Sequence, residues 1–62
     1  MNYSYWKENE SISMEIREEG NVYKFDGFLN PFGEFEPTHF ADDDSESFYN
    51  ANWEKIEDIF IK

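Results

Sequence analysis

A strict alternation of apolar and polar residues over positions 11–17 limits the fold more than any other feature of the chain. The apolar residues fall on one side of an extended backbone and the polar residues on the other, which is typical of a strand with one buried face. Residues 18–21 have the composition of a turn, and residues 22–28 resume an extended pattern rich in strand formers. The two runs together predict a β-hairpin.

The charges along the two runs select the register of this hairpin. One register places Glu15 opposite Lys24, which pairs opposite charges across the strands. The same register places Met14 opposite Phe25. A slip of the register would instead set Arg17 against Lys24, and like charges directly opposite each other destabilise a sheet. We therefore expect the first register.

A turn and a third strand are expected after the hairpin. Residues 30–33, with Asn first, Pro second and Gly fourth, suit a type I turn. Residues 34–40 then return as a strand, and Pro37 places this strand at a sheet edge or at a bulge because proline has no N–H to donate. The face that Phe35 occupies stays open, since a bulge at Gly33 would reverse the alternation.

The hydrophobic period changes to that of a helix from about Asp43 onward. Four apolar residues define one helical face: Tyr49, Trp53, Ile56 and Phe60. The opposite face is polar: Asp44, Ser47, Glu54 and Asp58. The acids near the start suit the positive end of the helix dipole. Two alternatives stay open, because residues 50–52 would suit a later start and residues 59–61 would suit a strand.

The expected fold class is α+β, in a single domain of residues 1–62. A small antiparallel sheet, made of the hairpin and a third edge strand, is packed by a C-terminal amphipathic helix. Thirteen aromatic residues against seven Ile, Leu and Val residues predict an aromatic core. The absence of cysteine, of a signal-peptide pattern and of a long apolar stretch predicts a cytoplasmic protein.

The chain is strongly acidic, with fifteen Asp and Glu residues against five Lys and Arg residues and a net charge of −10. Residues 34–62 hold nine acids and two bases, so this half carries a net charge of −7. A field of this sign repels nucleic acid and anionic membranes, and it attracts basic protein surfaces. We therefore expect a protein partner and neither direct nucleic-acid binding nor membrane binding.

No motif for catalysis or for a metal stands out. The acidic run at residues 42–46 invites a calcium interpretation, but a count from Asp42 or from Asp43 does not place both the glycine and the glutamate that an EF-hand loop requires. His39 is the only histidine, and no cysteine is available as a nucleophile. A metal-dependent enzyme is thus a minor hypothesis, and we expect a protein with no catalytic residues, no metal and no cofactor.

The leading hypothesis is a non-enzymatic protein that binds a basic protein surface, with a nucleic-acid-binding enzyme as the partner. In size and acidity the chain resembles the small inhibitors that phages and mobile elements use against such enzymes, some of which mimic DNA. Carboxylates one helical turn apart are spaced about as far as nucleic-acid phosphates. Tyr49 and Trp53 should pack the helix beneath the partner-binding acids, which are Asp42, Asp43, Asp44, Glu46, Glu54, Glu57 and Asp58.

The alternative hypothesis is an immunity-type or adaptor protein that binds through an aromatic patch. Tyr3, Tyr5 and Trp6 are the first candidates, because Tyr and Trp are enriched at interface hot spots. The same three side chains would otherwise cover the sheet. The oligomeric state and the identity of the partner stay open at this point.

Overall fold

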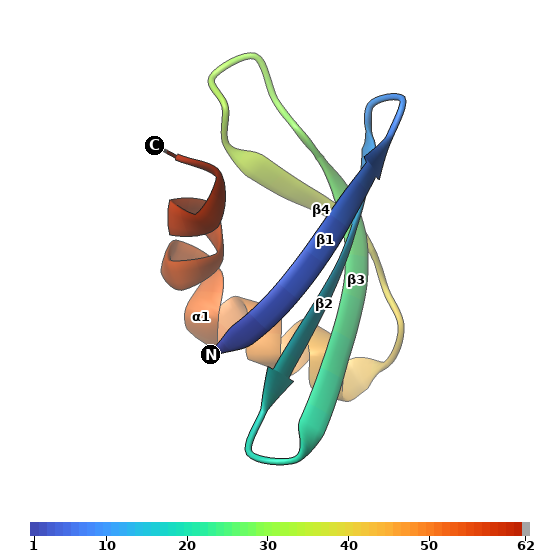
Figure 1. Cartoon of the computed structure of the whole chain (residues 1–62), viewed down its shortest axis with the longest axis vertical. Coiled ribbons are helices and arrows are strands. Elements are labelled where there is room, and N and C mark those ends of the chain that lie inside the picture. The colour runs from blue at the N-terminus through green and yellow to red at the C-terminus, as the bar shows by residue number, and fades with distance from the viewer. Residues whose placement is uncertain (62) are drawn as a thin grey trace.

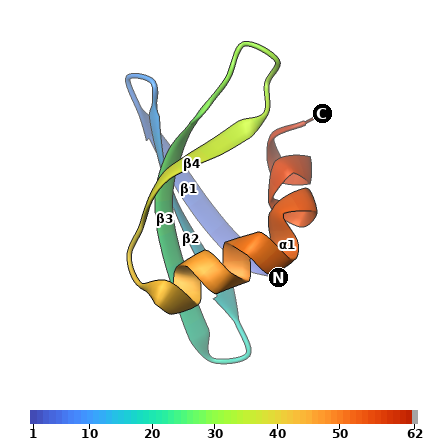
Figure 2. The ribbon, with the colours of Figure 1, turned by 180° about the vertical axis from the view of Figure 1, so that it is seen from behind.

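The chain folds into a four-stranded antiparallel sheet with one helix across one of its faces, as a computed structural model that describes residues 1–61 shows (Figure 1). The strands lie side by side in sequence order. Figure 2 shows the helix in front of the sheet. The expected α+β class is confirmed. The elements are β1, Asn2–Glu8; β2, Ser11–Glu18; β3, Asn21–Leu29; β4, Phe35–Phe40; and α1, Asp43–Phe60.

The hairpin of β2 and β3 has the register that the charges select. Glu15 lies opposite Lys24, as predicted. Two successive residues of the connecting turn have positive φ angles, Glu19 at 50° and Gly20 at 81°. This pair of angles is typical of a type I′ turn, whose twist matches that of the strands it joins. The predicted hairpin is therefore confirmed.

The N-terminal strand β1 forms one edge of the sheet, and the sequence patterns above do not predict it. All seven of its residues are exposed, and they pair with β2. Tyr3 and Tyr5 lie on the face that carries the helix, where the ring of Tyr5 meets that of Phe60 edge-on at a centroid distance of 5.0 Å. Trp6 lies on the open face, beside Ser13. These three N-terminal aromatics are 44%, 46% and 58% exposed, so they cover the sheet only in part.

Strand β4 forms the other edge, and the predicted turn leads into it. The N–H of Gly33 donates to the carbonyl oxygen of Asn30 at 2.9 Å and closes the turn. The register shifts between Asp26 and Gly27 of β3, where Thr38 is the extra residue of a bulge in β4, and Pro37 lies opposite Gly27. Pro37 is thus both at a sheet edge and at a bulge, which are the two positions expected for it.

The core lies between the sheet and the helix, and it combines aromatic with aliphatic side chains. Phe35, whose face the sequence leaves open, points into this core with 3% exposure and stacks on Phe60 at a centroid distance of 5.3 Å. Strand β2 and Ile56 of α1 contribute the non-aromatic part, so the core is less purely aromatic than expected. The buried hydrophobic residues are Ile12, Met14, Ile16, Phe25, Phe35, Phe48 and Ile56.

Helix α1 begins where the sequence predicts, immediately after Asp42. The carboxylate of Asp42 caps the helix by accepting the N–H of Ser45 at 2.8 Å. Residues 50–52 do not delay the start, and Ile59 belongs to the helix and not to a strand. The four residues of the predicted polar face are all exposed. No helix within residues 1–61 is long and apolar enough to span a membrane.

A kink at Asn52 bends α1 in the middle. Asn52 has φ −129° and ψ 19°, which are not helical angles. Its side-chain amide donates to the carbonyl oxygen of Phe48 at 3.0 Å, the acceptor that its own backbone N–H would use in a regular helix. Side chains that insert into the hydrogen-bond ladder are a recognised cause of helix kinks. The two halves of α1 therefore run in different directions, as Figure 2 shows.

The burial of residues along α1 corrects the prediction for Trp53. Trp53 is 47% exposed, whereas Ile56 is fully buried. Tyr49 packs as expected, with its ring edge-on to that of Phe25 at a centroid distance of 5.5 Å. The buried face of α1 is formed by Ser45, Phe48 and Ile56. Trp53 lies beside this face and does not support the helix from beneath.

Candidate functional site

The seven acids proposed for partner binding fall into two groups along α1. The first acidic group comprises Asp42, Asp43, Asp44 and Glu46, at the N-cap and in the first turn. The second acidic group comprises Glu54, Glu57 and Asp58, after the kink. Six of these side chains are exposed, and Glu57 is half-buried. The structure thus presents six of the seven carboxylates to solvent.

The kink at Asn52 separates the two acidic groups. The straight, rigid array that the sequence suggests is therefore replaced by two shorter arrays on differently directed helix segments (Figure 2). Within the second acidic group, Glu54 and Asp58 are both exposed and lie one helical turn apart, a spacing of about 5–6 Å between their Cβ atoms. Each segment keeps the local spacing, while the bend sets the direction in which each array faces.

Asp42 has a structural task besides its charge. Hydrogen bonds from the side chain and the backbone N–H of Ser45 hold the pKa of Asp42 below its usual value of 3.8. These hydrogen bonds favour the charged form of the carboxylate and hold it at the helix start. Its negative charge also lies at the positive end of the helix dipole, where an anion is stabilising.

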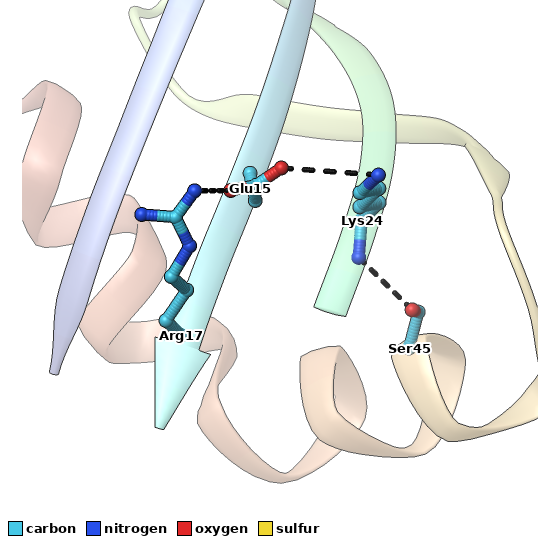
Figure 3. Close-up of polar contacts among 4 residues, drawn as sticks. All are labelled: Glu15, Arg17, Lys24 and Ser45. Carbon is cyan, nitrogen blue, oxygen red and sulfur yellow. Dashed lines mark hydrogen bonds and ion pairs between the residues drawn. The ribbon is translucent and has the colours of Figure 1, made fainter. Parts of the chain in front are cut away.

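Ser45 anchors the first acidic group to the sheet. This side chain is fully buried, and its hydroxyl oxygen accepts the backbone N–H of Lys24 at 3.0 Å (Figure 3). The backbone carbonyl of Lys24 accepts the N–H of Ala41 at 3.0 Å, just past the end of β4. Ser45 thus satisfies a β3 backbone group at the point where β4 leaves the sheet. The first turn of α1 is thereby held at a fixed position against β3.

Two cations of the sheet, those of β2 and β3, are paired with one carboxylate, that of Glu15. Arg17 contacts Glu15 at 2.5 Å, and Lys24 lies 3.9 Å from its other oxygen (Figure 3). The Glu15 side chain is only 17% exposed, so this pairing stabilises a partly buried charge. Within residues 1–61 no other carboxylate forms an ion pair. Neither acidic group of α1 is therefore neutralised by a cation of the described chain.

The open face of the sheet carries a second surface feature that the sequence patterns do not reveal. Trp6, Ser13, Asp26 and His39 are successive cross-strand partners, one from each strand. They line a hollow of about 330 Å³ together with neighbours on β2 and β3. The register of β1 brings Trp6 into this row. Because the sequence patterns do not predict β1, they do not reveal this row either.

The carboxylates of the described chain do not assemble a metal site. Within residues 1–61 no group of three or more His, Asp or Glu side chains could hold a metal ion, and this includes the acidic run at residues 42–46. Ser45, the serine nearest the start of α1, is buried and its hydroxyl oxygen already accepts a backbone N–H of β3. The arrangement offers charge and shape for binding a partner.

Comparison with known proteins gives no relative: no family model, no curated protein and no solved structure matches the chain. The function must therefore follow from the surface itself.

Proposed function

We propose that this chain is a non-enzymatic binding protein that engages a basic surface of another protein through the two acidic groups of α1. One observation carries the proposal: all seven of these carboxylates lack a cationic partner within residues 1–61, and six of them are exposed. Glu15, by contrast, holds two cations on the sheet. The charge of α1 is therefore directed outward and is available to a partner.

The size of the charge supports a role beyond solubility. A net charge of about 2–8 in magnitude is sufficient to keep a small domain soluble, and this chain carries −10. Like charges on a small body repel one another and lower its stability. A basic partner would relieve this repulsion on binding, and it would be steered to the surface at an increased association rate.

The class of partner follows from the chemistry of the acidic groups. Enzymes that bind nucleic acid present Lys and Arg side chains in rows that accept phosphates. Carboxylates at helical spacing fit such rows, and the bend in α1 places two short arrays at an angle to each other. We propose a nucleic-acid-binding enzyme as the partner and inhibition by occupancy of its phosphate sites, as an anti-defence protein of a phage or mobile element would act in the cytoplasm.

The direct test captures partners from a host lysate on the immobilised protein and then competes them off with duplex DNA. Proteins that recognise α1 as a phosphate mimic should be basic, and duplex DNA should displace them. Their affinity should fall steeply with salt, because each contact is an exposed charge pair. Captured proteins that are neither basic nor nucleic-acid-binding would contradict the proposal.

Two variants with equal net charge localise the binding surface. Each changes the net charge from −10 to −2 by four reversals, so a difference between them reports position and not total charge. The α1 variant should bind the captured partner at least about tenfold more weakly than the control variant, since a reversed charge repels the partner. Circular dichroism confirms that both are folded. The α1 variant carries Lys at Asp43, Asp44, Glu54 and Asp58, and the control carries Lys at Glu18, Glu19, Glu34 and Glu36.

A second candidate function, an immunity-type or adaptor protein, is favoured by the aromatic side chains of β1. Tyr3 and Tyr5 are about half exposed, their rings stack at a centroid distance of 6.4 Å, and Tyr5 continues onto Phe60. Trp6 lies on the opposite face, so it does not belong to this strip. A Tyr3→Ala and Tyr5→Ala variant that loses the partner, with an affinity that changes little with salt, would favour this function over charge mimicry.

A further inference from the structure

The open face of the sheet bears two hollows on either side of one tryptophan. Trp6 and Ser13 line both hollows. The first hollow extends from Trp6 across β2 and β3 to His39, and the second extends toward the β1–β2 turn. Trp6 is 58% exposed, the highest value among the aromatics within strands. Its indole ring therefore lies between two depressions that a partner side chain can enter.

The lining of the two hollows is predominantly acidic. It includes Glu8 and Glu10 in one hollow, and Glu15, Asp26 and Lys24 in the other. The first hollow, lined by two carboxylates and one ammonium group, has a formal charge of −1, and the second, lined by two carboxylates, has a formal charge of −2. The hollows thus carry the same sign as the whole chain, which has a net charge of −10.

Asp26 differs from Glu15 in being free to accept a cation. Glu15 is already held by Arg17 and Lys24. Asp26 is half-buried in the row between Ser13 and His39, and it forms no ion pair within residues 1–61. A carboxylate in this position is partly shielded from water, so a cation placed beside it would interact more strongly than at a fully exposed acid.

From this arrangement we infer that the open sheet face binds an arginine side chain of the basic partner, with the guanidinium stacked on Trp6 and paired with Asp26. The planar guanidinium stacks on an aromatic ring and donates to a carboxylate at the same time. A Lys ammonium presents no planar face to the indole, and phosphate or carboxylate groups would be repelled by the lining. The inference rests on the proposed function, because the arginine belongs to the basic partner proposed there. The partner would then contact the open sheet face as well as α1.

A second copy of this chain is a poor occupant of the hollows. Two copies would each bring a charge of −10 to the contact. The lining of the hollows is acidic, and the Arg17 side chain, the one arginine of the chain, is paired with Glu15. Charge complementarity therefore favours a basic partner.

The test titrates the isotopically labelled protein with a hexa-arginine peptide at physiological salt and follows each backbone amide and both indole N–H groups by NMR. The expected result is a set of shifts at the Trp6 indole and at the amides of Ser13, Asp26 and His39. Hexa-lysine should shift the same groups less, since the guanidinium gains from stacking.

Matched variants assign the contact to Trp6. Trp6→Ala should weaken hexa-arginine binding about threefold to tenfold, the range expected for loss of one cation–π contact. Trp53→Ala removes a tryptophan of similar exposure, 47%, from α1 and should leave binding at this face unchanged. Asp26→Asn keeps the shape of the side chain and removes its charge, so it tests the same site if Trp6→Ala fails to fold.

The possible outcomes separate this inference from the proposed function. Shifts confined to α1, with affinity unchanged in Trp6→Ala and Asp26→Asn, would overturn the inference and leave the proposed function in place. Shifts confined to the open face would support the inference and contradict the role of the acidic groups. Equal losses in Trp6→Ala and Trp53→Ala, or no shifts at all, would overturn the inference. Shifts that appear on protein concentration alone would assign the hollows to a second copy, and would also overturn it.

Discussion

The hydroxyl oxygen of Ser45 accepts the backbone N–H of Lys24 at 3.0 Å, which joins the first turn of α1 to strand β3. Ser45→Ala should lower the free energy of unfolding by about 1–3 kcal/mol, because a partly buried N–H is left without its acceptor. Ser47→Ala, at an exposed position of the same helix, should change the stability little. Urea unfolding of the two variants measures the difference, and equal midpoints would show that this hydrogen bond is unimportant.

The cap of α1 should make stability depend on pH. The pKa of Asp42 is lowered from 3.8 in the folded protein. Its contribution is therefore complete above the unfolded-state pKa and is lost as the pH falls through the folded-state pKa. Asp42→Ala should be less stable than the wild type at neutral pH, and this gap should narrow in strong acid. Asp42→Asn keeps a capping acceptor that does not titrate. Its free energy of unfolding should therefore be close to that of the wild type at neutral pH. A wild-type-to-alanine gap that is independent of pH would contradict this account.

The two halves of α1 should respond very differently to truncation of a large side chain. Ile56→Ala should lower the free energy of unfolding by about 2–5 kcal/mol, since Ile56 is fully buried. Trp53→Ala removes a larger side chain but one that is 47% exposed, and its cost should stay near about 1 kcal/mol or below. Denaturant midpoints give the comparison. A larger loss for Trp53→Ala would mean that the helix is straight and that Trp53 packs in the core.

Gly27 should tolerate no side chain. A Cβ at this position would overlap the carbonyl oxygen of Glu36 and the ring of Phe35. Gly27→Ala should therefore cost about 1–3 kcal/mol of stability, the usual range for overpacking. The atom nearest to such a Cβ is the backbone carbonyl oxygen of Glu36. Replacing the Phe35 ring with a smaller side chain, in Phe35→Leu, should therefore not remove the stability cost of Gly27→Ala. Thermal unfolding of the single and double variants tests this. If Gly27→Ala cost no stability in the Phe35→Leu background, the prediction would be contradicted.

The hairpin and the helix start were accessible from the sequence because local chemistry determines them. The cross-strand charges of Glu15 and Lys24 select one register. An aspartate followed by an acidic turn is a strong helix-start signal, and Asp42 indeed caps α1. These features depend on residues close in sequence or directly opposite in a hairpin, so no knowledge of the tertiary structure is needed.

The strand β1 and the bend in α1 were not accessible in this way. Tyr3 and Tyr5 alternate with polar residues, but Trp6 lies on the polar side of that pattern and breaks it. The bend depends on one side-chain hydrogen bond from Asn52 to Phe48, which helical periodicity does not encode. Both omissions affect the candidate sites, because β1 supplies Trp6 to the open face and the bend divides the acids of α1.

The position of β1 also protects the protein from aggregation through a free sheet edge. Its own side chains are all exposed, yet it covers the backbone edge of β2, the strand that carries Ile12, Met14 and Ile16 at 0–2% exposure. If β1 were detached, β2 would become a free edge with alternating apolar side chains, which is a template for pairing with other chains. The first strand is thus a safeguard against aggregation, and intact N-terminal pairing is a condition for handling this protein at high concentration.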